Sequence, residues 1–181
     1  MAYSPDRITI DGIAFEPYIS DEEIQTRVEA LAHELCEKYR DHDLMLISVL
    51  RGAFIFTADF YRNFEMDVPI SFLKASSYDG LESSGQVEFS GIDEKDIVGK
   101  DILILEDIVD TGNTLSALCP RLLELGAVSV GICSLLLKPD ELKHELPDLS
   151  VGFEIPSRFV VGYGLDYNEK GRNLAGIYIR K

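Results

Sequence analysis

The chain has 181 residues, of which 46% are hydrophobic and 27% charged, so it can form one compact domain with a sizeable core but not two large domains. Its 32 acidic residues outnumber 17 basic ones and give a formal net charge of -15, which argues against non-specific binding to nucleic-acid phosphates or anionic lipids. The longest nearly uninterrupted apolar stretch, 127–137, is far shorter than the roughly 20 residues that span a bilayer, and the N-terminus lacks the layout of a signal peptide. We therefore expect a cytoplasmic protein.

The cysteines and histidines are scattered along the chain, without CxxC spacing or a nearby histidine pair. This pattern indicates neither a disulfide framework nor a zinc site. We expect buried, reduced thiols and imidazoles on the surface. These residues are Cys36, Cys119, Cys133, His33, His42 and His144.

The first half of the chain predicts a helix, a strand, a second helix and a second strand. The first helix begins at a capping box, Ser20 to Glu23, and continues with apolar residues at helical spacing as far as Arg40. A short apolar run over 44–50 predicts a strand buried on both faces, and helical spacing resumes over 53–64. A strand over 70–75 precedes a polar, glycine-bearing segment over 76–91, which we predict to be a long loop or a loose hairpin. Loops of that length in small domains are usually functional.

The second half repeats the alternation of strands and helices. We predict a strand over 101–105, a helix over 115–125 closed by Gly126, and a strand over 128–137, followed by short strands over 151–155, 159–163 and 177–179. Short apolar strands alternating with helices of about a dozen residues indicate an α/β fold with a mainly parallel sheet flanked by helices. We find no internal repeat or linker, so 1–181 is expected to be a single domain.

The most informative segment runs from the strand over 101–105 into the helix after it. Three acids, Glu106, Asp107 and Asp110, precede a turn made of Thr111, Gly112, Asn113 and Thr114. In open α/β sheets, ligands bind beyond the carboxyl ends of the strands. The turn would present backbone N–H groups at a helix N-terminus, which suits a phosphate. Glu106 and Asp107 would repel a phosphate, and they suit ribose hydroxyls or a cation.

Other interpretations of this segment compete with a functional site. A single acid or threonine here would more often cap the helix, and solvated acids are common on surfaces. Three carboxylates with a Thr-Gly-x-Thr turn at the end of one apolar strand favour a functional site. The segment has no Gly-Lys-Ser/Thr, which excludes a Walker A loop, and it lacks the Asp-x-Asp-x-Thr spacing of haloacid dehalogenase-type enzymes.

Residues 106–115 resemble the phosphoribosyl pyrophosphate signature of type I phosphoribosyltransferases, and specifically of the hypoxanthine-guanine phosphoribosyltransferases. The resemblance implies a type I phosphoribosyltransferase-like core with a small hood and a flexible lid loop. It also implies transfer of a phosphoribosyl group to a purine base, with release of pyrophosphate and with Mg²⁺ as cofactor. Further segments match in the same order: 50–52, 77–78, 134–138, 151–156, 159–163 and 165–169.

The resemblance assigns a role to each part of the segment 106–114. The turn Thr111 to Thr114 would bind the 5′-phosphate, and Glu106 and Asp107 would bind the ribose hydroxyls. Asp110 would be the acid/base group for the purine N7 proton, which a carboxylate can be if burial or a neighbouring acid raises its pKa.

The resemblance also assigns residues outside that segment. Lys138, Phe159, Val160 and Asp166 would contact the purine, Arg51, Gly52 and Arg172 would bind pyrophosphate, and Ser77 and Tyr78 would begin the lid. Asp166, Glu106 and Asp107 would lie near the metal. Taken alone, Lys138 or Arg172 could be surface charges, Phe159 a core aromatic, and the lid a surface loop. Three residues depart from the family pattern: Arg51 replaces a lysine, Asn113 often corresponds to a lysine, and Gly171 replaces a bulkier residue.

Two alternatives belong to other functional classes. One is a non-catalytic relative that senses nucleotides or binds RNA as a regulator, against which the net charge and the lack of a basic stripe argue. The other is a phosphohydrolase. For the enzyme, we expect small-molecule substrates, no nucleic acid or membrane partner, and a homodimer or homotetramer.

Overall fold

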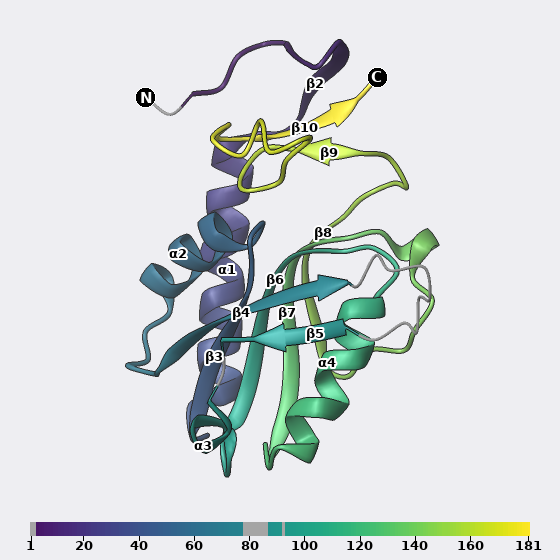
Figure 1. Cartoon of the computed structure of the whole chain (residues 1–181). Helices are drawn as coiled ribbons and strands as arrows, with labels where there is room; N and C mark the ends of the chain where they lie inside the picture. The colour runs from purple at the N-terminus through teal and green to yellow at the C-terminus, as the bar shows by residue number, and fades with distance from the viewer. Residues whose placement is uncertain (1–2, 78–86, 92) are drawn as a thin grey trace.

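The computed structural model describes residues 3–77, 87–91 and 93–181, with the backbone alone for 75–77 and 87–89. Two sheets are present, a six-stranded core sheet and a four-stranded sheet above it, which we call the hood (Figure 1). The strand order is β5-β4-β3-β6-β7-β8 in the core and β1-β2-β10-β9 in the hood.

The core contains most of the secondary structure. Its strands are β3 (Leu44–Leu50), β4 (Ile70–Ser77), β5 (Val87–Ser90), β6 (Asp101–Val109), β7 (Ser129–Leu137) and β8 (Leu149–Glu154). Its helices are α1 (Asp21–Tyr39), α2 (Phe54–Asn63), α3 (Glu94–Ile97), α4 (Asn113–Glu124) and the 3-10 turn η1 (Pro139–Glu141). The hood strands are β1 (Ile8–Ile10), β2 (Ile13–Ile19), β9 (Val160–Val161) and β10 (Ile177–Arg180).

The core sheet confirms the predicted α/β class. Strands β4, β3, β6, β7 and β8 are parallel, and β5 is antiparallel at one edge. The central strands β3, β6 and β7 are apolar because both faces are covered, by α1 and α2 on one side and by α4 on the other (Figure 1). This arrangement is the mainly parallel sheet flanked by helices that the sequence predicts.

Helix α1 begins where the capping box predicts. The Ser20 hydroxyl accepts a hydrogen bond from the backbone N–H of Glu23 at 3.2 Å, and the Glu23 carboxylate accepts one from the N–H of Ser20 at 2.9 Å. The apolar stripe of the helix, including Ile24, Val28 and Leu31, is fully buried. The helix therefore lies firmly against the core sheet.

The hood lies over the carboxyl ends of the parallel strands (Figure 1). Its strand β2 pairs antiparallel with β10, so that Phe15 is the register partner of Arg180. The sequence prediction missed β1 and β2, because β2 contains Pro17 and Glu16 and lacks a clean alternation of apolar and polar residues. Strands β9 and β10 correspond to the predicted strands over 159–163 and 177–179, and β9 is shorter than expected.

Two boundaries beside the predicted site differ from prediction. Strand β6 extends to Val109 because its pairing with β7 continues to Leu137, so Glu106 and Asp107 lie on the strand instead of after it. Helix α4 begins at Asn113, before the predicted start. The segment over 76–91 contains β5, which pairs with β4 as in the hairpin alternative. Tyr78 of the predicted lid lies outside the described residues.

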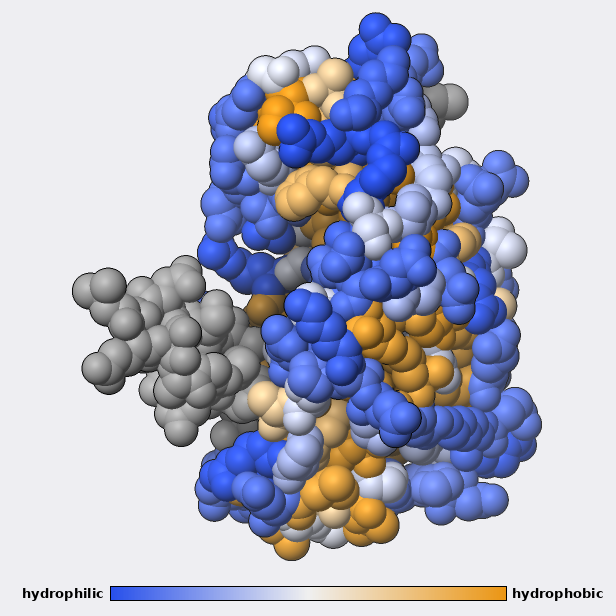
Figure 2. Space-filling model, turned by 90° about the vertical axis from the view of Figure 1, so that its right-hand side faces the viewer, coloured by the Kyte–Doolittle hydropathy of each residue, from blue (hydrophilic) through white to orange (hydrophobic). Residues whose placement is uncertain are grey.

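The surface agrees with the acidic composition. Figure 2 shows the side of the molecule that carries α4 and β8, where hydrophilic residues cover most of the face and hydrophobic ones gather near its centre and at its lower end. The three cysteines are free and buried, and the three histidines are exposed, as predicted. Among the described residues, no helix combines the length and the apolar character needed to cross a membrane.

Candidate active site

A cavity of about 280 Å³ opens at the carboxyl ends of β3 and β6. It is lined by the last residues of β3 and by the continuous segment that the sequence singled out. The structure thus brings the acids and the Thr-Gly-Asn-Thr turn together around one space. The lining residues are Val49, Leu50, Glu106, Asp107, Ile108, Val109, Asp110, Thr111, Gly112, Asn113, Thr114 and Leu115.

The turn before α4 has the geometry of an anion cradle. Gly112 is the N-cap residue, with φ of +77°, and it provides no side-chain cap. Its left-handed backbone suits glycine, and a side chain there would also press on Leu142 at 3.0 Å. Among the residues that the structure describes, the Thr111 hydroxyl makes only a long contact, 3.4 Å, with the N–H of Asn113. The first turn of a twelve-residue helix therefore presents its N–H groups and its positive dipole end to the cavity.

Glu106 and Asp107 form a closely spaced acid pair beside this cradle. The Glu106 residue is 7% exposed, and its carboxylate accepts a hydrogen bond from the backbone N–H of Asp107 at 3.1 Å. Burial, together with the neighbouring Asp107, raises the pKa of Glu106 well above its usual range. Burial also raises the pKa of Asp107, although the Arg172 charge opposes the rise. The oxygens of the pair are therefore suited to accept hydrogen bonds from the hydroxyl groups of a ligand.

The raised pKa of Glu106 predicts a pH-dependent effect of its neutral analogue. Above the usual glutamate pKa of 4.5, the unfolded chain loses a proton that the folded protein still holds, so the free energy of unfolding falls as pH rises toward the folded pKa. Glutamine does not titrate, so the Glu106→Gln variant should keep its free energy of unfolding as pH rises. We therefore expect its Tm to exceed that of the wild type at pH 7, with a difference that shrinks toward pH 4. Thermal melts of both proteins without ligand measure this difference in Tm. The exposed Glu34→Gln variant should track the wild type, and a Tm gap that grows toward acid pH would contradict the burial argument.

Asp110 and Lys138 form an ion pair across the ends of β6 and β7. Their charged atoms are 3.0 Å apart, with the Lys138 side chain 11% exposed and that of Asp110 49% exposed. The backbone N–H of Lys138 also donates to the carbonyl oxygen of Val109 at 2.9 Å. The burial and acidic neighbour that the sequence argument required of Asp110 are instead found at Glu106 and Asp107. At Asp110 the structure places an ammonium group that can orient the carboxylate.

The loop after β3 brings the hood to the acid pair. The peptide bond between Leu50 and Arg51 is cis. A Cβ at Gly52 would lie 1.5 Å from Oδ2 of Asp107, and a Cβ at Gly164 would lie 2.1 Å from the Gly52 carbonyl oxygen. Only glycine allows the two backbones and the carboxylate to approach this closely.

The hood residues predicted to contact the purine lie near one another. Phe159 is 43% exposed and packs edge-on against Tyr167, with ring centroids 5.6 Å apart. Val160 is buried in β9 and faces Ile179 of β10. Asp166 pairs with Arg172 at 2.7 Å. An aromatic face thus stays accessible beside a strand whose backbone is held in register.

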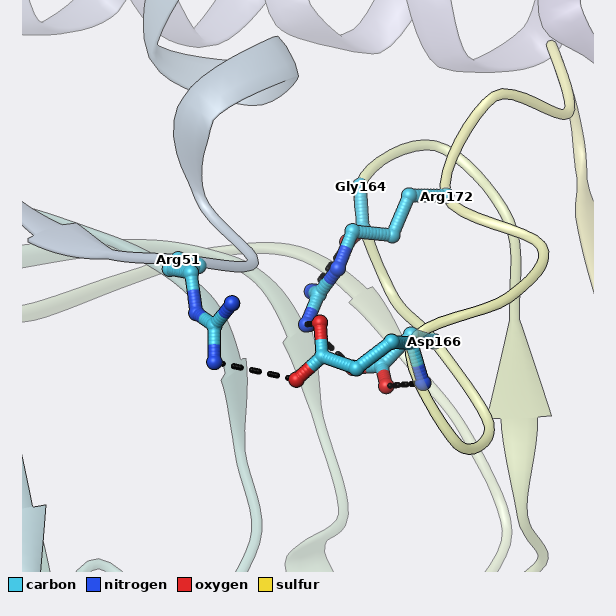
Figure 3. Close-up of polar contacts among 5 residues, drawn as sticks. Arg51, Gly164, Asp166 and Arg172 are labelled. Atoms are coloured by element: carbon cyan, nitrogen blue, oxygen red, sulfur yellow. Dashed lines mark hydrogen bonds and ion pairs between the residues drawn. The ribbon is translucent and has the colours of Figure 1, made fainter.

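The predicted pyrophosphate arginines converge in the same region. Arg172 donates to the Gly164 carbonyl oxygen at 2.8 Å, and Arg51 approaches from the loop after β3 (Figure 3). Glu169, which the sequence interpretation missed, contacts both arginines, at 2.9 Å from Arg51 and 3.2 Å from Arg172. His144 was also missed, and its ring lies 2.7 Å from the side-chain oxygen of Asn113. The contacts of Arg51 with Glu169 and of Asn113 with His144 join residues that are far apart in sequence, so sequence spacing could not reveal them.

Within the described part of the chain, no group of three or more acidic, histidine or cysteine side chains is arranged to hold a metal ion. The carboxylates of Glu106, Asp107 and Asp166 are nevertheless the hard oxygen donors that Mg²⁺ prefers. Magnesium commonly takes only one or two protein carboxylates and completes its shell with water and phosphate oxygens. The donor set therefore fits a magnesium ion that binds together with a phosphorylated ligand.

Comparison with known proteins identifies the family to which the chain belongs. The phosphoribosyl transferase domain model matches residues 19–168. The chain is 40% identical over 162 residues to a hypoxanthine phosphoribosyltransferase of Escherichia coli, covering 88% of this chain and 91% of that protein. It is 43% identical over 164 residues to a hypoxanthine-guanine phosphoribosyltransferase of Bacillus subtilis, covering 90% of this chain and 91% of that protein. The crystal structure of a hypoxanthine phosphoribosyltransferase from Staphylococcus aureus superimposes with a TM-score of 0.84 at 36% identity, covering 92% of this chain and 91% of that one. The chain belongs to the phosphoribosyltransferase family.

Proposed function

We propose that this protein is a hypoxanthine-guanine phosphoribosyltransferase of purine salvage. It transfers the phosphoribosyl group of 5-phosphoribosyl 1-pyrophosphate to hypoxanthine or guanine and gives IMP or GMP and pyrophosphate. The observation that carries the proposal is the convergence of an anion cradle, a buried acid pair and the Asp110–Lys138 ion pair at one edge of the sheet. Relatives of about 40% identity over most of the chain bear the names of such enzymes.

The sugar phosphate is positioned by the segment between β6 and α4. The backbone N–H groups of the turn Thr111 to Thr114, with the two threonine hydroxyls, bind the 5′-phosphate. Glu106 and Asp107 accept hydrogen bonds from the ribose hydroxyls. Their position beside the anomeric carbon also stabilises the positive charge that develops there as pyrophosphate leaves. Both effects lower the barrier without any covalent contribution from the protein.

The purine is bound between the end of β7 and the hood. Lys138 donates to the 6-oxo group of the base, and Asp110 handles the N7 proton as the new bond to the sugar forms. The 3.0 Å contact between these two side chains supports a shared role, because it holds the ammonium group beside the carboxylate. Phe159 stacks on the base, and the backbone of Val160 reads its edge.

Pyrophosphate is bound by Arg51, Arg172 and the backbone at Gly52. Arginine forks suit phosphate oxygens because they donate two parallel hydrogen bonds. Mg²⁺ would be held near Asp166 and the acid pair, where it would neutralise the charge of the departing pyrophosphate.

Further features of the enzyme complete the proposal. The chain acts as a single domain on small molecules, in the cytoplasm, as a homodimer or homotetramer. The segment that begins at Ser77 and Tyr78 acts as a lid that excludes water from the activated sugar.

The direct test supplies purified protein with MgCl₂, phosphoribosyl pyrophosphate and each base. We expect IMP and GMP to form, together with one pyrophosphate per nucleotide, as measured by chromatography. Competition among hypoxanthine, guanine and xanthine then ranks the bases. Absence of both nucleotides would overturn the proposal, and nucleotide or RNA binding without turnover would favour the regulatory alternative.

A further inference from the structure

One carboxylate lies between the two arginines assigned to pyrophosphate. Oε1 of Glu169 is 2.9 Å from Arg51, and Oε2 is 3.2 Å from Arg172. The arginines come from separate segments and point toward the same space (Figure 3). Two guanidinium groups that converge on one anionic group form the arrangement that a diphosphate requires.

The two arginines depend on Glu169 to different extents. Arg172 is held independently, because it donates to the Gly164 carbonyl oxygen at 2.8 Å and pairs with Asp166 at 2.7 Å. For Arg51, Glu169 is the one polar side-chain partner recorded in the described part of the chain. The Arg51 and Glu169 side chains are 65% and 60% exposed, so their attraction is screened by water and readily exchanged for a stronger anion.

The backbone at Glu169 makes a glutamate there costly. Asn168 and Glu169, with φ of +50° and +62°, form a two-residue turn closed by reciprocal hydrogen bonds between Tyr167 and Lys170 at 3.0 and 3.1 Å. Glycine is favoured at the second position of such turns because a Cβ is strained there. A charged residue that tolerates this strain and reaches two arginines is a candidate for a functional role.

The turn is anchored so that the carboxylate faces the arginines. The side chains of Asn168 and Lys170 both bind Asp11 in the turn between β1 and β2. The backbone N–H of Glu169 donates to Oδ2 of Asp166 at 2.8 Å. Because its neighbours are fixed to the hood, the Glu169 side chain is held beside the two arginines.

We propose that Glu169 is an internal competitor for the pyrophosphate site. This inference rests on the proposed function, because that function assigns Arg51 and Arg172 to pyrophosphate. In the free protein the carboxylate neutralises both arginines, and it is displaced when phosphoribosyl pyrophosphate binds. After the reaction it returns to the arginines and assists the release of pyrophosphate, so it keeps the affinity for the product low.

The test is titration of the full-length protein with sodium pyrophosphate, with and without MgCl₂, by calorimetry. Glu169→Gln removes the charge and keeps the shape, and we expect its Kd for pyrophosphate to fall by about two- to fivefold. Glu169→Gly removes the whole side chain at a backbone position that glycine prefers, so it should fold at least as well and show the same change. In steady-state assays, both variants should lower the KM for phosphoribosyl pyrophosphate and leave that for hypoxanthine unchanged.

The matched control is Glu34→Gln, which also removes an exposed carboxylate paired with an arginine, Arg27, outside the site. Its Kd should equal that of the wild type, so a shift there would attribute the effect to net charge and overturn the inference. Unchanged or weaker pyrophosphate binding in both Glu169 variants would also overturn it, even if the wild type makes nucleotide normally. If the wild type makes no nucleotide but the variants bind pyrophosphate more tightly, the proposed function fails and the competitor role stands.

Discussion

Asp110→Asn is expected to reduce the kcat of nucleotide formation by about 10²- to 10⁴-fold, the usual contribution of a general acid or base. The amide preserves the shape of the side chain but cannot take up the purine N7 proton. The anion cradle and the acid pair remain, so the KM for phosphoribosyl pyrophosphate should change by less than about threefold. Steady-state kinetics with hypoxanthine, together with calorimetric binding of the sugar phosphate, separate these effects.

The interpretation depends on two controls. Asp140→Asn makes the same chemical change at a neighbouring exposed aspartate in η1 and should leave kcat unchanged. Because the Asp110 side chain is 49% exposed, its substitution should change the free energy of unfolding by no more than about 0.5 kcal/mol. Equal losses in turnover and in sugar-phosphate binding would remove the assigned proton role and leave Asp110 as a group that positions Lys138.

Gly52→Ala is expected to lower kcat/KM by about 100-fold or more, although the substitution adds only a methyl group. The new Cβ would lie 1.5 Å from Oδ2 of Asp107, so the loop, the carboxylate or both must move. A displacement of about 1 Å in a catalytic arrangement can cost 10²-fold in rate. Both the proposed ribose contact of Asp107 and the proposed pyrophosphate contact of the loop should be weakened, which raises the KM for phosphoribosyl pyrophosphate as kcat falls.

Gly99→Ala serves as the matched glycine control. A Cβ at Gly99 meets no atom within 4 Å, and its φ of +77° makes the substitution a test of backbone strain alone. We expect it to cost about 1 kcal/mol of stability and to leave kcat/KM unchanged. If Gly52→Ala retained wild-type kinetics, the close packing of the loop against Asp107 would not matter for catalysis.

Much of the core could be predicted because local patterns and global packing agree there. The capping box at Ser20 begins α1 as expected, and the buried runs over 44–50 and 128–137 become β3 and β7. The cavity lined by 106–115 was also foreseen as one site, since the motif is continuous in sequence. The roles of these side chains remain predictions that the substitutions above can test.

The hood strand β2 and several contacts in the site could not be predicted, because they depend on the packing of distant segments. Strand β2 is specified by pairing with β10, and no periodicity in its own residues reveals it. The contact between Gly52 and Asp107, and the position of Glu169 between two arginines, arise only after the hood and the core meet. The pKa shift of Glu106 likewise reflects burial, which the sequence of an acidic segment does not indicate.

The pairing of β2 with β10 also has a consequence for the order of assembly during synthesis. The core strands and α1 are joined by short connections and can associate as soon as they leave the ribosome. Strand β2, by contrast, cannot pair with β10 until the last residues of the chain, including Arg180, have been synthesised. A nascent chain can therefore form the turn over 111–114 and the acid pair well before the hood sheet is complete.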